Sequence, residues 1–420
     1  MSRLVLNNAR LFDGERPVIA GATVVVDGNR VVAAGGEAVE SAPGDRVVDL
    51  GGRTVMPGMV TCHFHATYHD VGAAPTPFGN ERHPAYQAIL AVQHLQSALD
   101  RGYTGAVSAG GAHDIDPALA EALADGAIVG PRFIPGSRDI SSTGFGNDSS
   151  PWYWGVTASP GARVCDGADA VRAAVRDEIK RGARTIKLFV TPGHGVGIPI
   201  DALDMTAAEV EAAVEAAHDR GVLIRAHVVT RRGLDIVIGA GVDLVDHGDH
   251  LDDELIARMA NAGTFLAPSL LTTRRILDLY GGPAMGFDDL DRSFGILRDA
   301  DAAGVKIVAG DDYGSVVLTH GDYSQELSLY ANEGGIPPVA VLRWATKNGA
   351  ELLGLGSEVG TLRPGKLADL LVVDGDPLDD ITVLEDEARL VAIMRDGVLV
   401  KDGLAPLETR TTEESLPVLA

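Results

Sequence analysis

The hydrophobic positions of the chain follow two different patterns. Over the first 56 residues, short apolar runs such as residues 22–26 lie between turn-forming pairs such as Asp13-Gly14. Short runs of β-branched residues between such pairs predict strands joined by tight turns. The same pattern returns at residues 369–374 and 390–400. We therefore expect residues 1–56 and 358–420 to form one composite β-sandwich built from both chain ends.

Between these ends, residues 57–357 alternate helical stretches with short apolar strands. This alternation predicts parallel βαβ units, and a closed (β/α)8 TIM barrel fits the length best. A doubly wound open sheet is the alternative, but no Gly-x-Gly-x-x-Gly fingerprint follows the first strand. After a first apolar run that leads to His65, we expect barrel strands at residues 104–109, 132–135, 185–190, 223–228, 244–247, 264–267 and 306–309.

Composition narrows the classes of function. Of the 420 residues, 45% are hydrophobic, and 51 glycines fit a folded core with many tight turns. A formal net charge of −24 argues against nucleic acid and anionic membranes as partners. The first residues run straight into a strand pattern without a signal segment, and no apolar stretch reaches membrane-spanning length, so we expect a cytoplasmic protein.

The two cysteines, Cys62 and Cys165, cannot build a disulfide framework or a cysteine zinc cluster, so any metal must be held by other side chains. His63 and His65 are the first candidates, because residues i and i+2 of a strand point to the same side. With this alternation, both histidines and Thr61 face the side of the strand that carries the candidate site, whereas Cys62 faces the helices. An isolated His-x-His is common by chance, so its interpretation depends on the rest of the chain.

Further polar groups lie on other predicted barrel strands. Lys187 lies inside one apolar strand, His227 and His247 lie at or near the ends of two more, and Asp311-Asp312 follow another. In a parallel barrel all these strand ends open on one rim. Each histidine alone would more simply be a hydrogen-bonded interior residue. Together with the first histidine pair and a rim carboxylate, they predict a metal centre.

Lys187 allows two interpretations from the strand alone. A buried ammonium is costly unless it is paired, neutralised or modified. Desolvation lowers the pKa of a lysine, and the neutral amine can add carbon dioxide to form a carbamate whose two oxygens can bridge two metal ions. The other interpretation is a lysine paired with an acid in the barrel interior.

Aromatic residues gather in one stretch, although the chain is only 5% aromatic. On the active rim they would suit a hydrophobic or aryl substrate. A packing role, or a contact between subunits of a homo-oligomer, is an equally good interpretation. A glycine-rich loop after the Lys187 strand adds one histidine, and one tyrosine follows Asp312. The candidate substrate contacts are therefore Phe145, Trp152, Trp154, His194 and Tyr313.

The segment at residues 57–65, taken with the later lysine, histidines and Gly-Asp-Asp segment, resembles the amidohydrolase superfamily. Residues 344–354 and 360–370 are similar to its subgroup of imidazolonepropionase and prolidase-like dipeptidases. The resemblance covers nearly the whole chain. It implies two divalent ions, usually zinc. One ion would bind His63, His65, Asp312 and carboxylated Lys187, and the other Lys187, His227 and His247. The family motif Gly-Thr-Asp aligns its aspartate with Asp312, and Asp311 is the alternative ligand.

The resemblance also implies a mechanism. Two divalent ions would activate a water and polarise a carbonyl, and Asp312 would take the proton of the water and deliver it to the leaving group. We therefore expect a metal-dependent hydrolase that cleaves an amide, carbamate, urea-like or peptide bond of a small molecule. A prolidase-like dipeptidase is one alternative, and a lyase or isomerase on the same barrel is another.

Three departures from the family pattern concern the substrate. Thr61 stands where the family has an aspartate before x-His-x-His. The segment after His227 lacks a second histidine that prolidase-like members often carry, and Phe145 lies where they have Gly-Gly-His-Gly-Asp. These losses of polar groups favour a hydrophobic or aryl substrate over a charged dipeptide.

Overall fold

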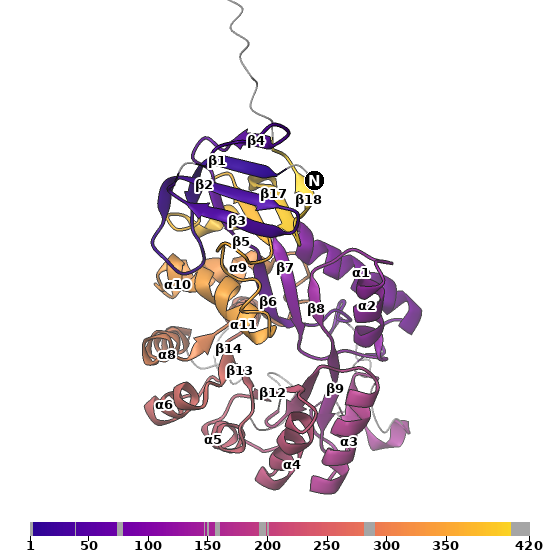
Figure 1. Ribbon diagram of the computed structural model, residues 1–420. Helices are drawn as coiled ribbons and strands as arrows, with labels where there is room; N and C mark the ends of the chain where they lie inside the picture. Colours follow the sequence, from indigo (N-terminus) through magenta and orange to yellow (C-terminus); the bar gives the residue numbers. More distant parts are fainter. Residues whose placement is uncertain are drawn as a thin grey trace, which may run out of the picture.

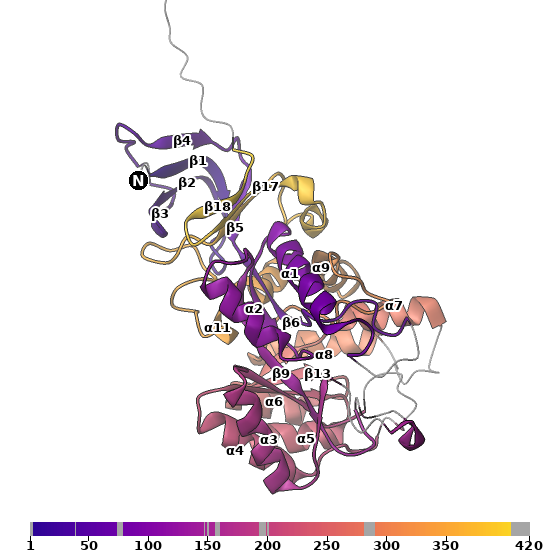
Figure 2. The same ribbon diagram turned by 90° about the vertical axis from the view of Figure 1, so that its right-hand side faces the viewer.

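The computed structural model describes residues 3–37, 39–73, 79–146, 148, 151–155, 160–192, 199, 201–280 and 290–404. Strands from the two chain ends lie side by side at one end of the molecule, and a barrel wrapped by helices forms the rest (Figure 1). A turn of 90° shows α1 and α2 beside the barrel and α3 to α6 at the end away from the terminal strands (Figure 2).

The terminal strands form one eight-stranded mixed sheet in the order β18-β17-β16-β5-β1-β2-β3, with β4 paired to β1. The two chain ends meet where β5 pairs antiparallel with β16, so that Met56 lies opposite Leu371. Buried side chains from both ends, including Val24 and Leu370, share one core cluster. The strands are β1 (Leu4–Leu11), β2 (Ile19–Asp27), β3 (Arg30–Gly35), β4 (Arg46–Asp49), β5 (Thr54–Pro57), β16 (Leu370–Val373), β17 (Leu390–Arg395) and β18 (Val398–Asp402).

The barrel strands run parallel in two sheets that follow one another around the barrel. The first sheet has the order β6-β7-β8, and the second has the order β10-β9-β11-β12-β13-β14-β15. The strands are β6 (Met59–Phe64), β7 (Tyr103–Ser108), β8 (Arg132–Ile134), β9 (Gly136–Ser141), β10 (Ala162–Val164), β11 (Thr185–Phe189), β12 (Leu223–Val228), β13 (Leu244–His247), β14 (Phe265–Ala267) and β15 (Lys306–Ile307).

Helices connect and cover these strands, and none of those described is long and apolar enough to cross a membrane. The α-helices are α1 (Pro84–Asp100), α2 (Ile115–Ala124), α3 (Ala168–Lys180), α4 (Ala207–His218), α5 (Arg231–Ala240), α6 (Asp253–Ala262), α7 (Leu270–Tyr280), α8 (Leu290–Ala303), α9 (Tyr323–Ser328), α10 (Pro338–Arg343) and α11 (Gly349–Leu352). The 3₁₀-helices are η1 (Trp152–Trp154), η5 (Ile381–Leu384) and η6 (Glu387–Arg389), and the π-helices are η3 (Leu329–Glu333) and η4 (Trp344–Asn348).

The third barrel position is a single extended segment interrupted by a proline. β8 pairs with β7, and β9, which is separated from β8 by a single residue, pairs with β11. Pro135 lies between them and lacks the N–H that a continuous ladder needs. The sequence pattern predicts the first part of this segment, but β9 and the short neighbouring β10 were not predicted.

The barrel closes where the chain after β15 approaches β6. The Cys62 amide donates to the carbonyl of Ala309 at 2.6 Å, and Gly310 follows with a φ of +144°. A Cβ at this glycine would lie 2.2 Å from the backbone nitrogen of His63. Only glycine allows this approach. Closure therefore places the residues after Gly310 directly beside His63.

One loop on the rim is tied to the barrel by a buried carboxylate. Asp204 accepts hydrogen bonds from the Ser142 amide at 2.7 Å and its hydroxyl at 2.6 Å. The side chain is buried, and burial raises its pKa to about 7 in spite of these bonds. Next to it, the exposed Asp166 accepts two hydrogen bonds from Thr143, which lower its pKa.

Replacement of Gly310 by alanine should destabilise the protein by about 3 kcal/mol or more, because the new Cβ forces β6 and the segment after β15 apart. Gly304→Ala is the matched control: its φ of +89° is also left-handed, but a Cβ there meets nothing within 4 Å. It should cost about 1 kcal/mol. Denaturant unfolding measures both, and equal losses would contradict this account of closure.

Asp204→Asn should change how stability depends on pH. Between the ordinary carboxyl pKa of 3.8 and about 7, the native Asp204 holds a proton that the unfolded chain has released. The wild-type free energy of unfolding therefore falls as pH rises through this window, by at most about 4 kcal/mol from this group. The variant lacks this loss, so its stability relative to wild type should rise from pH 4 to pH 7.

Asp166→Asn is the control, and its sign is opposite because the native pKa of Asp166 is lowered. Its relative stability should fall slightly as pH rises through the range in which that carboxyl ionises, up to its ordinary pKa of 3.8, and should then be nearly flat from pH 4 to pH 7. A flat difference between Asp204→Asn and wild type from pH 4 to pH 7 would show that the carboxyl is not held neutral.

Candidate metal centre

His63 and His65 reach the site from a strand that departs from regular alternation. Between two paired positions, β6 advances from Thr61 to Phe64 while β7 advances only from Ala106 to Ser108. β6 therefore carries one extra residue, which is a β-bulge. The predicted parity was wrong for Cys62: it packs with Leu244 and Val308 in a cluster inside the barrel. The bulge lets Cys62 face the interior while the residue after it still reaches the rim.

Hydrogen bonds fix which nitrogen of each ring is free to bind a ligand. His65 Nδ1 lies 2.9 Å from the carbonyl oxygen of Gly110, so this nitrogen carries the proton and donates. The Ser269 hydroxyl donates to the carbonyl of Gly310 at 3.1 Å, and it therefore accepts from His63 Nδ1 at 2.7 Å. The Nε2 atom of each ring is consequently left with its lone pair.

The Nε2 atoms of both rings lie close to the carboxylate of Asp312. Its Oδ1 lies 2.9 Å from Nε2 of His63 and 3.2 Å from Nε2 of His65. Burial alone would raise the pKa of Asp312, but its contacts with His63 and His65 favour the ionised carboxylate and lower its pKa well below its usual range. Burial lowers the pKa of His65 to about 4, so this ring is neutral near pH 7.

Two further histidines complete the ring cluster. His247 ends β13 with a φ of +72°, a strained conformation that turns the backbone at the site. Its Nε2 lies 3.9 Å from Oδ2 of Asp312, and its ring meets that of His227 with centroids 4.5 Å apart. His227 donates from Nε2 to the carbonyl of Pro192 at 3.1 Å, which leaves Nδ1 as its acceptor atom.

Asp311, the alternative ligand, faces away from these rings. One of its carboxylate oxygens accepts from the amides of Leu271 and Thr272 at the start of α7, and the other accepts from the Asp312 amide. Burial and the charge of Asp312 raise its pKa to about 6. Asp311 therefore caps α7, and the structure brings Asp312 rather than Asp311 to the histidines.

Lys187 lies in the barrel interior and is 2% exposed. Its Nζ lies 2.6 Å from Oδ2 of Asp246, so the unmodified side chain has the predicted acid partner. Arg225 binds the same carboxylate through two nitrogens. Burial would raise the pKa of Asp246, but the charges of Arg225 and Lys187 lower it well below its usual range. Asp246 therefore lies between two cations inside the barrel.

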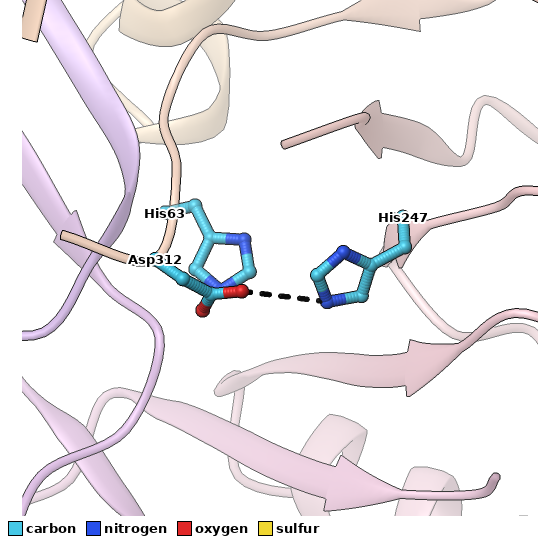
Figure 3. A group of neighbouring side chains, drawn as sticks. All are labelled: His63, His247 and Asp312. Carbon is cyan, nitrogen blue, oxygen red and sulfur yellow. Dashed lines mark ion pairs between the residues drawn. The ribbon is translucent and has the colours of Figure 1, made fainter. Parts of the chain in front are cut away.

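The geometry fits a bound cation. Atoms of His63, His247 and Asp312 lie within 4.8 Å of one another, and the carboxylate points toward both rings (Figure 3). His63 Nε2 is buried and, apart from Asp312, meets no polar partner among the described residues. A cation between the unprotonated ring nitrogens and the ionised carboxylate would stabilise this arrangement. Neutral imidazole nitrogens and carboxylate oxygens are ligands of zinc.

The candidate substrate contacts have different surroundings. In η1, Trp152 is 87% and Trp154 49% exposed, and Phe145 is half-buried in the loop held by Asp204. Tyr313 is fully buried, and its hydroxyl donates to the carbonyl of Tyr323 at 3.0 Å, so the structure does not bring it to the site. His194 lies outside the described residues.

Sequence reasoning missed three residues that support the cluster: Arg225, Asp246 and Ser269. The first two carried a signal, because each is a charged residue inside an apolar strand, as Lys187 is. Ser269 carried none, since its contact with His63 depends on two segments about 200 residues apart. The Thr61 hydroxyl, at the position of the family aspartate, is buried without a hydrogen-bond partner among the described residues.

Comparison with known proteins tests the predicted family. The chain is 27% identical to ochratoxinase of Aspergillus niger over 382 residues, which is 84% of this chain and 77% of that protein. Among solved structures, a prolidase complexed with N-methylphosphonate-L-proline matches with a TM-score of 0.82 and 30% identity, over 96% of this chain and all of that one. A Xaa-Pro dipeptidase with bound methionine matches with a TM-score of 0.83 and 29% identity, over 95% of this chain and 100% of that one.

The family model for the amidohydrolase family matches residues 54–400. This match spans the barrel and the strands from both chain ends, and it confirms the resemblance drawn from the sequence. The chain therefore belongs to the amidohydrolase family and is, like its relatives there, a hydrolase that acts on carbon–nitrogen bonds.

Proposed function

We propose that this hydrolase cleaves an amide-type bond of a hydrophobic or aryl small molecule, with two zinc ions as cofactors. The observation that carries the metal assignment is that Nε2 of His63 and Nε2 of His65 lie 2.9 Å and 3.2 Å from the same oxygen of the ionised Asp312. These groups repel one another unless a cation lies between them.

Two sets of residues would hold the ions. His63, His65, Asp312 and Lys187 would bind one, and Lys187, His227 and His247 the other, with Lys187 carboxylated so that its two oxygens serve both. This requires Nζ of Lys187 to leave Asp246 and react as the neutral amine with carbon dioxide, which forms an N–C bond and releases one proton. When bound, divalent ions lower the pKa of water and polarise the carbonyl that is attacked.

The protein's own groups carry the proton and the orientation. The Asp312 side chain keeps 29% exposure, so it is accessible from the rim. As an ionised carboxylate it accepts the proton of the attacking water and returns it to the leaving nitrogen. Gly110 and Ser269 hold His65 and His63 in one tautomer, which leaves Nε2 of each ring to bind the metal.

The substrate class rests on the aromatic residues of the rim. Trp152, Tyr153 and Trp154 follow one another in η1 and are 49% to 87% exposed, so they offer aromatic faces to an apolar group. The same residues would equally serve as a contact between subunits of a homo-oligomer. Similarity to a prolidase and to a Xaa-Pro dipeptidase supports dipeptide hydrolysis as the second candidate function.

Asp312→Asn should lower kcat by about 10²- to 10⁴-fold, because the amide keeps an oxygen near the histidines but cannot accept the proton. His218→Ala is the control: this histidine is 44% exposed on α4, where it pairs with Asp243, and the variant should keep wild-type kcat. Steady-state kinetics with added zinc and bicarbonate measure both. Wild-type kcat in Asp312→Asn would contradict the assigned role.

A substrate panel separates the candidate functions. The zinc-loaded protein is incubated separately with aryl amides, carbamates, ureas, N-acyl amino acids and X-Pro dipeptides. The masses of the products are then measured by mass spectrometry. Preference for an aryl or apolar substrate with a gain of one water supports the proposal. Preference for X-Pro dipeptides establishes the dipeptidase instead, and a product without the added water indicates a lyase or isomerase.

A further inference from the structure

Arg225 occupies an unusual place for an arginine. It lies on β12, two residues before His227 and on the same side of the strand, and it is 0% exposed. In the parallel register it lies between Lys187 on β11 and Leu244 on β13, both of which face the barrel interior. Its guanidinium is therefore enclosed below the ring cluster.

Every contact of this guanidinium is made inside the barrel. Nε donates to Oδ2 of Asp246 at 3.0 Å, and Nη2 donates to Oδ1 of the same carboxylate. Nη1 donates to the carbonyl of Cys62 at 2.8 Å and to that of Ser108 at 3.0 Å. One side chain thus joins β6, β7 and β13 to its own strand β12.

The partners of Arg225 lie next to the proposed metal ligands. Cys62 directly precedes His63, and Asp246 directly precedes His247. Asp246 also binds Lys187, and its Oδ1 lies 3.8 Å from Nδ1 of His63. A shift of the guanidinium would therefore move backbone or side-chain groups of ligands on four different strands.

We propose that Arg225 is a positioning residue of the metal centre, which sets the depth and spacing of the ligand-bearing strand ends. The proposal rests on the proposed function only in that the ligands are those of a metal site. The planar guanidinium of an arginine has several N–H donors and can bind a carboxylate and two carbonyls in fixed directions. A lysine ammonium cannot do this. Arg225 also keeps a cation on Asp246 whichever group Nζ of Lys187 binds.

A purely structural role for Arg225 makes a different prediction from a positioning role. Loss of a buried arginine that pairs with a buried aspartate lowers stability wherever it lies. Arg132 provides the comparison, because it binds the buried Asp369 through two nitrogens at 3.0 Å, where β8 begins. That pair lies at the opposite end of the barrel strands from the metal centre. Only a positioning residue should change the binding of metal.

The experiment uses the full chain stripped with a chelator and titrated with Co²⁺ in bicarbonate buffer, for wild type, Arg225→Lys, Arg225→Met and Arg132→Met. The affinity is taken from the titration and the coordination from the visible absorption of cobalt. Arg225→Lys keeps a cation beside Asp246 but cannot reach both carbonyls, so it tests the geometry if Arg225→Met does not fold.

Both Arg225 variants should bind Co²⁺ about tenfold to 100-fold more weakly and with an altered spectrum. Arg132→Met should lose thermal stability with wild-type affinity and spectrum. Wild-type affinity and spectrum in Arg225→Lys would overturn the positioning role while leaving the proposed function intact. Failure of the wild-type chain to bind Co²⁺ would instead overturn the proposed function itself.

Discussion

The ionised carboxylate of Asp246, enclosed in the barrel, is the interaction on which the rest of the site depends. A buried anion without a compensating cation would cost about 3–5 kcal/mol, so its partners are fixed with it. Arg225 and Lys187 supply the compensation, and through them four strands that carry His63, His247, His227 and Lys187 are tied to one point. The same contacts therefore balance the charge of the interior and hold the strand ends at the rim in place.

Two features of the backbone then orient the side chains of the proposed ligands. The bulge in β6 lets Cys62 pack inward and His63 reach the rim, and Gly310 lets the chain after β15 approach within contact of His63. Asp311 fixes the direction of its neighbour by capping α7, which leaves Asp312 facing the rings. The ligands thus come from separate strands, but each is held by a contact to a neighbouring strand or helix, which is the arrangement that a preorganised site requires.

Much of this arrangement could be predicted from the sequence, because strand ends in a parallel barrel open on one rim. The strands at Leu223–Val228 and Leu244–His247 have the predicted bounds, and His63, His65, His247 and Asp312 come together as expected. The bulge could not be predicted, since it is a mismatch between two strands and leaves no mark in either alone. The sequence predicted an acid partner for Lys187 but did not identify Asp246. Regular alternation places Asp246 and His247 on opposite faces of the strand, so a ligand role for His247 would turn Asp246 away from the interior. The positive φ of His247 breaks this alternation and lets both side chains face inward.

We propose that the histidine rings and the Asp312 carboxylate form a metal centre rather than a cluster linked by protons. Anomalous diffraction at the zinc absorption edge, from crystals grown with zinc and bicarbonate, tests it most directly. We expect a zinc signal between the rings of His63 and His65 and the carboxylate of Asp312, with Nζ of Lys187 moved away from Asp246. Zinc found only elsewhere on the protein, with Lys187 still paired to Asp246, would contradict it.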